Sequence, residues 1–174
     1  MRTFFGLLIL VFAVARQAAP QAASPQAGDD AIATAVAASI RGYVHFSIFD
    51  DVNIAVNGRA VTLTGRVTMP FKRDDIGARV SKIDGVHSVV NEIGVLPVSP
   101  IDQNLRVKIA RAIYSHPSFW QYASMANPPI HIVVERGRVT LTGRVNSDVE
   151  RMLAYSLAQV DGTLGVTNQL KLDK

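Results

Sequence analysis

The chain has 174 residues, with 18 lysines and arginines, 14 aspartates and glutamates, and no cysteine. The missing cysteine excludes disulfides, thiolate metal sites and lipid attachment through an N-terminal cysteine. A net charge of +4 falls short of the basic stripe typical of nucleic-acid-binding proteins, so nucleic acid is not an expected partner.

The first residues have the pattern of a secretory signal. Arg2 precedes an apolar run that ends at Val14, and Ala13-Val14-Ala15 offers a small-residue cleavage site. The run is shorter than the about 20 residues of a membrane-spanning helix, although an uncleaved anchor is the alternative. We predict a signal peptide over residues 1–15, cleaved between residues 15 and 24, and a disordered linker over residues 16–28. The mature protein is expected in the periplasm.

An exact repeat shows how the rest of the chain is organised. Residues 61–67, Val-Thr-Leu-Thr-Gly-Arg-Val, recur unchanged as residues 139–145. Such a repeat indicates two copies of one small module. We assign residues 29–97 to module 1 and residues 100–174 to module 2, joined by a proline-stiffened linker over residues 97–100. The short linker predicts a fixed mutual orientation of the modules.

Each module opens with a predicted amphipathic helix. Apolar residues recur at every fourth position, namely Ile32, Val36 and Ile40 in module 1 and Leu105, Ile109 and Ile113 in module 2. This spacing places them on one helical face. Asp29-Asp30 and Asp102 precede these stripes, and an acidic residue there suits a helix cap and the helix dipole.

A β-hairpin is predicted to follow each first helix. Apolar and polar residues alternate on both sides of Asn57-Gly58 and of Arg136-Gly137, which are the predicted turns. Module 1 has one more residue than module 2 between the turn glycine and the second strand, which we interpret as a bulge.

A second helix and a last strand complete each module. Asp74-Asp75 and Asn146-Ser147-Asp148 are the predicted helix starts, and Asp84-Gly85 and Asp161-Gly162 the predicted helix stops. The fold class is therefore α+β: two tandem αββαβ modules, each a small mixed three-stranded sheet covered on one face by two helices. The glycines with a predicted structural role are Gly58, Gly65, Gly85, Gly137, Gly143 and Gly162.

The sequence contains no recognisable catalytic or metal site. The four histidines have no metal-ligand spacing, and the paired aspartates suit helix capping better than acid–base chemistry. We therefore predict no catalytic residues, no metal, no cofactor and no small-molecule substrate.

The segment over residues 114–130 is unusual, because it is longer than its counterpart in module 1 and holds the single tryptophan. Tryptophan and tyrosine favour the membrane–water interface, and basic residues of the preceding helix add attraction to anionic lipid. The candidate membrane or partner contact consists of Arg106, Lys108, Arg111, Phe119, Trp120 and Tyr122. The alternative, that these rings fill the core of the module, stays open.

The hairpin and the last strand resemble the BON domain. The matching segments are residues 58–67 with 83–91 and residues 137–145 with 160–168, and Thr163 departs from the valine of the family pattern. The resemblance implies a non-catalytic periplasmic protein, linked to envelope or osmotic stress, that attaches to phospholipid or to envelope proteins.

We therefore expect a non-enzymatic envelope binding or adaptor protein that attaches to phospholipid surfaces. The alternative is a protein–protein interaction module of an envelope assembly. Hydrolysis of envelope polymers would need a site constellation that the sequence does not contain.

Overall fold

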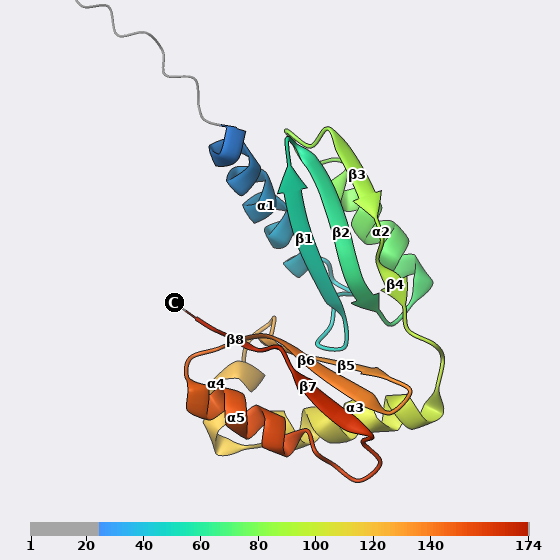
Figure 1. Ribbon diagram of the computed structural model, residues 1–174, viewed down its shortest axis with the longest axis vertical. Helices are drawn as coiled ribbons and strands as arrows, with labels where there is room; N and C mark the ends of the chain where they lie inside the picture. Colours follow the sequence, from blue (N-terminus) through green and yellow to red (C-terminus); the bar gives the residue numbers. More distant parts are fainter. Residues whose placement is uncertain (1–24, 174) are drawn as a thin grey trace, which may run out of the picture.

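The computed structural model describes residues 25–173, so the predicted signal peptide and residues 16–24 of the predicted linker lie outside the described residues. Figure 1 shows two modules stacked along the long axis and joined by one connection near residue 100. Module 1 contains α1 (Pro25–Arg41), β1 (Asp51–Asn57), β2 (Ala60–Val67), α2 (Pro70–Val80), β3 (Ser88–Asn91) and β4 (Gly94–Val95). Module 2 contains α3 (Pro100–Tyr114), η1 (Pro117–Phe119), α4 (Trp120–Ala123), β5 (Ile130–Glu135), β6 (Arg138–Val145), α5 (Asp148–Leu157), β7 (Gly165–Asn168) and β8 (Lys171–Leu172).

The predicted α+β class and αββαβ order are confirmed. In each module the hairpin strands pair antiparallel, and the last strand pairs parallel to the second, giving the orders β1-β2-β3 and β5-β6-β7. The last strand is broken into two pieces, because an asparagine side chain interrupts it. Asn91 Oδ1 accepts from Ile93 N at 3.3 Å and Asn91 Nδ2 donates to Arg73 O at 2.8 Å. Asn168 repeats this arrangement in module 2.

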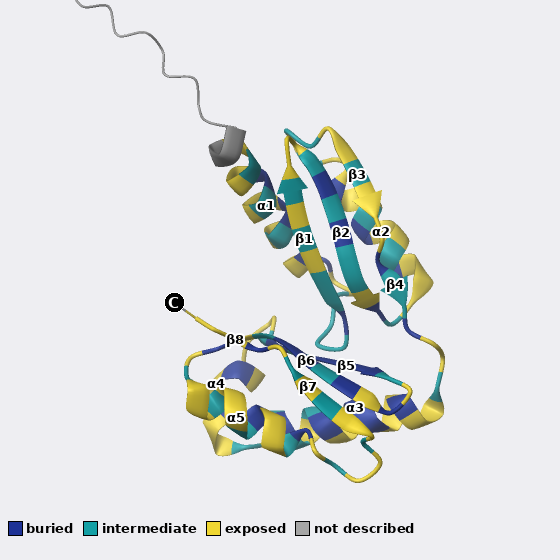
Figure 2. Cartoon of the chain, viewed as in Figure 1, coloured by how far each residue is buried: buried dark blue, intermediate teal, exposed yellow. Residues whose placement is uncertain are grey.

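Each module has its own core between its sheet and its two main helices (Figure 2). The predicted helical stripes are buried there, since Val36, Ile109 and Ile113 have no exposed surface. The core of module 2 also receives Ile48 and Phe49, which come from the loop before β1 of module 1. The two cores are therefore separate but joined at one point.

The helix boundaries correct several predictions. Helix α1 begins at Pro25 rather than at Asp29, so residues 25–28 of the predicted linker are helical. Helix α2 begins at Pro70, which places Asp74-Asp75 inside the helix rather than at its start. Proline at a first helical position is favourable, since its missing N–H needs no partner there. Helices α2 and α5 end at Val80 and Leu157, several residues before Gly85 and Gly162, so these glycines turn the chain toward β3 and β7 rather than stopping the helix.

The two hairpin turns have the same length, so the predicted bulge in module 1 is wrong. The loop residues are Gly58-Arg59 and Arg136-Gly137, and all four have positive φ. Such a turn matches the twist of the flanking strands, and the glycine simply occupies the first loop position in one module and the second in the other.

Asp29 and Asp102 bind these turns and do not cap their helices. Asp29 accepts from Gly58 N at 2.8 Å and Arg59 N at 2.9 Å. Asp102 accepts from Arg136 N and Gly137 N, both at 2.8 Å, while Ser99 is the actual cap of α3. The acidic residue therefore ties each first helix to its hairpin.

Direct contacts hold the two modules together. Ile132 N donates to Ile48 O at 2.6 Å, which extends the free edge of β5 with the loop of module 1. Thr142 Oγ1 donates to Asp51 Oδ1 at 2.8 Å, and Arg66 lies 3.5 Å from Glu135. Their mutual orientation therefore has direct support beyond the linker, whose Pro100 belongs to α3.

Candidate binding surfaces

Three of the six predicted contact residues are buried and do not form a surface. Arg106 is 4% exposed and donates through Nη2 to Val134 O at 2.7 Å and through Nη1 to Gln103 at 3.2 Å. Burial lowers the pKa of its guanidinium. Arg106 therefore fastens α3 to the end of β5 rather than meeting an external partner.

Phe119 and Tyr122 belong to the core of module 2. Phe119 has no exposed surface, Tyr122 is 4% exposed, and the two rings stack with centroids 6.0 Å apart. The extra length of this segment forms η1 and α4, which fold the rings back against α3. The core alternative is thus correct for these two rings, because a short helix turns them toward the sheet.

Tyr122 takes the place of a buried ion pair in module 1. In module 1 the Asp50 carboxylate accepts from Thr68 N at 2.8 Å and from Lys72 Nζ at 2.7 Å. In module 2 the Tyr122 hydroxyl accepts from Asn146 N at 3.1 Å and donates to Glu150 at 2.7 Å. Burial, followed by the Glu150 hydrogen bond, raises the pKa of Tyr122 to about 12.

Three predicted contact residues remain exposed, namely Lys108, Arg111 and Trp120. Lys108 and Arg111 lie one turn apart on the outer side of α3, where residues three apart are neighbours. Trp120 is 63% exposed and its indole Nε1 donates to Ser115 O, at the end of α3, at 3.1 Å. We call these three side chains the α3 surface.

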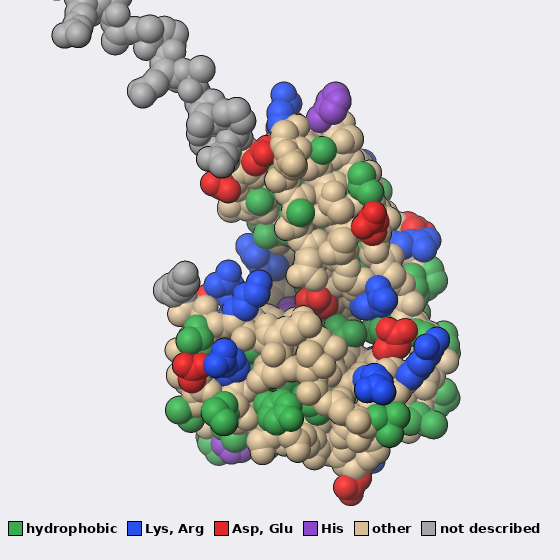
Figure 3. Space-filling model, viewed as in Figure 1, with side chains coloured by type: hydrophobic (Ala, Val, Ile, Leu, Met, Phe, Trp, Pro, Cys, Tyr) green, Lys and Arg blue, Asp and Glu red, His purple; other side chains and the backbone are tan. Residues whose placement is uncertain are grey.

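A second candidate surface is the cleft between the modules, which the sequence did not predict. Its volume is about 720 Å³, and it opens at the notch where basic side chains gather in Figure 3. Module 1 contributes the end of α1, the loop before β1 and β1 itself, and module 2 contributes residues 126–129 and parts of β5, β6 and β8. Arg41, Arg144 and Lys171 are its cationic lining residues.

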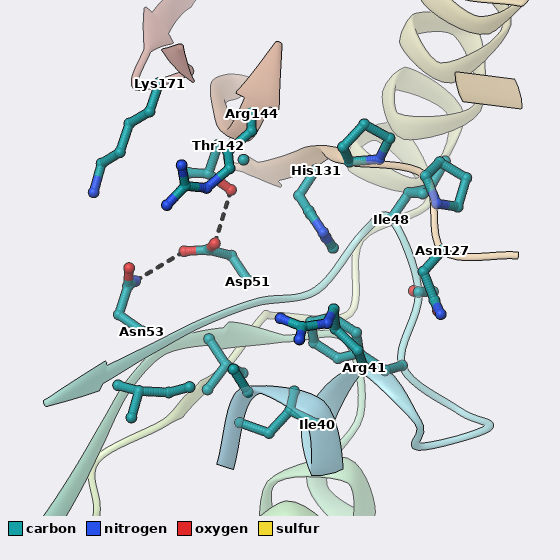
Figure 4. Close-up of a pocket in the computed structure, with 18 of the residues that line it drawn as sticks. Ile40, Arg41, Ile48, Asp51, Asn53, Asn127, His131, Thr142, Arg144 and Lys171 are labelled. Atoms are coloured by element: carbon teal, nitrogen blue, oxygen red, sulfur yellow. Dashed lines mark hydrogen bonds between the residues drawn. The ribbon is translucent and has the colours of Figure 1, made fainter. Parts of the chain in front are cut away.

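The floor of this cleft is organised by hydrogen bonds across the modules (Figure 4). The His131 Nδ1 lies 2.7 Å from Asp50 O, so Nδ1 carries the proton, and the ring packs beside Phe46. The Asp51 carboxylate accepts from Thr142 and from Asn53 Nδ2 at 3.0 Å. The contacts of His131 and Thr142 join residues far apart in the sequence, which is why repeat patterns within one module gave no signal for them.

Within residues 25–173, no group of three or more acidic or histidine side chains is arranged to hold a metal ion. Among the same residues, no helix combines the length and apolar character needed to cross a membrane.

Comparisons with known proteins identify the modules. The family profile of the BON domain matches twice, at residues 28–97 and 101–174. No curated protein matches the chain. One similar solved structure is CdsD, a structural protein of the type III secretion system of Chlamydia trachomatis, with 14% identity, a TM-score of 0.29, and coverage of 80% of this chain and 92% of that one. Another is the C-terminal domain of CdsD, with 13% identity, a TM-score of 0.26, and coverage of 79% and 96%.

Likenesses at that level say nothing about what this chain binds, whereas the two profile matches span nearly all of residues 28–174. BON domains are non-catalytic binding domains of envelope proteins, and they bind membranes or other proteins. The chain belongs to the BON domain family and contains two BON domains in tandem.

Proposed function

We propose that the protein is a non-enzymatic, periplasmic binding protein that attaches reversibly to anionic phospholipid surfaces through the α3 surface. The observation that carries the proposal is the exposed Trp120 ring, 63% accessible, at the end of the helix that presents Lys108 and Arg111. An indole beside cations is the composition expected where a protein meets anionic head groups.

The contrast between Trp120 and its neighbours supports this reading. Phe119 and Tyr122 are buried in the core of module 2, whereas Trp120, the largest ring of the segment, faces solvent. The Trp120 indole N–H already has a partner in Ser115 O, so the ring can enter the interface without leaving that donor unsatisfied.

The expected attachment is weak and sensitive to salt. Each basic residue near an anionic surface contributes about 1 kcal/mol, so Lys108 and Arg111 together contribute about 2 kcal/mol. The buried Arg106 adds nothing to this attraction, so two basic residues contribute to membrane binding instead of the three that the sequence predicts. Reversible attachment rather than stable anchoring follows.

Cosedimentation of the mature full-length chain with vesicles tests the proposal. Vesicles that contain phosphatidylglycerol should bind the protein, whereas phosphatidylcholine vesicles should not. The double variant Lys108→Gln/Arg111→Gln should lose about 2 kcal/mol, or roughly thirtyfold in affinity. A matched control, Lys82→Gln/Arg138→Gln, removes the same charge from exposed sites elsewhere and should lose much less.

If the control loses as much affinity as the α3 double variant, net charge and not the α3 surface governs attachment. If neither vesicle binds the wild-type chain, the proposed membrane function is wrong.

An exposed apolar patch on α5 and on the loop before β7 favours protein–protein interaction as the second candidate function. Val149, Met152 and Leu164 are 76%, 70% and 73% exposed, and Figure 3 shows hydrophobic side chains gathered over α5. Exposed apolar side chains that gather in one patch suit a protein partner. A photocrosslinker at Met152 should give one adduct of defined mass in the envelope, whereas one at Lys82 should give none. A lack of adduct at both positions would count against this candidate.

A further inference from the structure

The cleft between the two modules carries more positive charge than its folding role requires. Arg41, Arg144 and Lys171 come from α1, β6 and β8, and all three are exposed side chains. Figure 4 shows Arg144 and Lys171 extending from module 2 toward β1, with Arg41 facing them from the end of α1. Like charges that converge from three elements repel one another, so an anion between them is the simplest compensation.

The protein itself supplies little negative charge for these cations. Asp51 is the one carboxylate among the cleft-lining residues, and its oxygens already accept from Thr142 and Asn53. Arg144 lies 3.4 Å from Asp173, but both side chains are more than half exposed, so this pair is weak. Within residues 25–173, Arg41 and Lys171 make no ion pair.

The cleft also has an apolar part to its lining. It contains Phe46 and Ile48 from module 1 and Pro128 and Pro129 from module 2. A volume of about 720 Å³ lies within the range of small-molecule sites, which combine apolar walls with a few placed polar groups. The cleft is thus suited to a ligand with one anionic end and an apolar part.

The cleft is also pre-organised. The hydrogen bonds of Ile132 to Ile48 and of His131 to Asp50 O fix the two walls relative to each other. Less ordering is then required when a ligand binds.

Comparison of the two modules shows that the cationic lining is not a by-product of the repeated domain. By the repeat alignment, Arg41 corresponds to Tyr114 and Lys171 corresponds to Gly94. Tyr114 instead donates to Ile130 O within module 2. Arg144 has a counterpart in Arg66, but Arg66 is not among the residues that line the cleft. The charges therefore gather only where the two modules meet.

We propose that this cleft binds the phosphate group of a small organic phosphate or of a phospholipid head group. Arg41, Arg144 and Lys171 hold the phosphate, and the wall of Phe46 and Ile48 contacts the adjoining apolar part. Arginine suits this role because its planar fork matches phosphate oxygens. The proposal does not depend on the α3 surface, since α3 covers the other face of the module 2 sheet (Figure 1).

Calorimetric titration of the mature full-length chain tests the proposal with three soluble probes. These are dihexanoyl phosphatidylglycerol below its micelle concentration, zwitterionic dihexanoyl phosphatidylcholine, and inorganic phosphate. We expect the phosphatidylglycerol to bind and the phosphatidylcholine to bind at least tenfold more weakly. Arg144→Gln/Lys171→Gln should weaken binding at least tenfold without lowering the thermal midpoint of the free protein, because both side chains are exposed. Lys82→Gln/Arg138→Gln, which removes the same charge from exposed sites outside the cleft and the α3 surface, should stay within twofold of wild type.

Amide NMR spectra locate the bound probe, with expected shifts at Asn53 and Gly143 and none at Lys108. Inorganic phosphate binding as tightly as phosphatidylglycerol would support a phosphate site and identify free phosphate as the source. Three results would overturn the proposal: no binding of either anionic probe, equal binding of phosphatidylcholine, or an equal loss in the Lys82→Gln/Arg138→Gln control. The two proposals can fail separately. If phosphatidylglycerol binds in the cleft but Lys108→Gln/Arg111→Gln sediments with vesicles as well as wild type does, attachment through the α3 surface is wrong and the cleft proposal stands.

Discussion

Asp50 is the residue on which module 1 depends most for its polar interior. It is completely buried, and its carboxylate accepts from the backbone and hydroxyl of both Ser47 and Thr68 and from Lys72 Nζ. Burial alone raises the pKa of Asp50, but hydrogen bonds from Lys72, Ser47 and Thr68 outweigh it and hold the pKa below its ordinary value. The carboxylate therefore stays charged and joins the loop before β1 to the start of α2.

Replacing Asp50 with asparagine should destabilise the protein by about 3 kcal/mol, because Lys72 is left buried without its counter-charge. The folded-state pKa of Asp50 lies below its unfolded-state value, so the unfolded chain binds the proton more tightly. The stabilisation that the ionised Asp50 gives the folded wild-type protein is therefore fully present above pH 3.8. It is lost as the pH falls through the lower pKa that Asp50 has in the folded state.

Urea unfolding at pH 7 and at acidic pH measures this difference. Asp74→Asn, at an exposed aspartate beside Arg73, is the matched control and should change stability by less than about 0.5 kcal/mol. Equal midpoints for Asp50→Asn and wild type at pH 7 would contradict the assigned ion pair.

Gly143 allows the two strands of the second hairpin to approach closely. Its φ is +106°, and a Cβ there would lie 1.8 Å from Pro129 O. Gly143→Ala should therefore cost at least about 2 kcal/mol. Gly165→Ala is the control, because a Cβ at Gly165 meets no atom within 4 Å. Similar unfolding midpoints for the two variants would contradict the close approach of Gly143 to Pro129 O.

At the scale of elements, the repeat predicted most of the fold, since hydrophobic periods of two and near four directly report which faces are buried. The starts of α1 and α3 were placed wrongly because an acidic residue before an apolar stripe has two possible partners, whereas the predicted start of α5 at Asn146-Ser147-Asp148 is confirmed. Asp29 and Asp102 bind the hairpin turns, a contact across 29 to 35 residues that local pattern does not report.

The aromatic segment shows the same limit. The sequence located the rings but not their directions, because η1 and α4 alternate buried and exposed positions within four residues. Phe119 and Tyr122 face the core, and Trp120 faces solvent. Arg106 was misassigned for a related reason: a basic residue on a short helix can lie on the buried face when a strand carbonyl, here Val134 O, accepts its hydrogen bond.

Paired substitutions in this segment separate core from surface. Phe119→Ala should cost about 4 kcal/mol, the range for a fully buried ring. Trp120→Ala should cost less than about 1 kcal/mol, because most of the ring is already exposed to solvent. Thermal or denaturant unfolding of both variants measures this, and an equally large loss for Trp120→Ala would mean that Trp120 is a core residue.

At the scale of the whole molecule, two domains of one family differ in what they present to their surroundings. Residues 30–97 carry seven basic and seven acidic side chains, whereas residues 100–174 carry nine and six. Four of the nine cations of module 2 lie in the two candidate surfaces, with Lys108 and Arg111 on the α3 surface and Arg144 and Lys171 in the cleft. The α3 surface lies within module 2 and needs its inserted segment, whereas the cleft needs both modules.

Export precedes any envelope function. We predict that the chain is cleaved between residues 15 and 24, which leaves a short tether before α1. N-terminal sequencing of the protein from the envelope fraction should find a start within this range. An intact Met1 on protein from the cytoplasmic fraction would contradict export.

Trp120 is the single tryptophan of the chain, so its fluorescence reports the α3 surface without a label. Adding vesicles that contain phosphatidylglycerol should shift its emission to shorter wavelength, and lipids brominated in their acyl chains should quench it, because the indole enters the interface. Phosphatidylcholine vesicles should do neither. Emission that stays unchanged at lipid concentrations where the protein sediments with the vesicles would contradict attachment through the α3 surface.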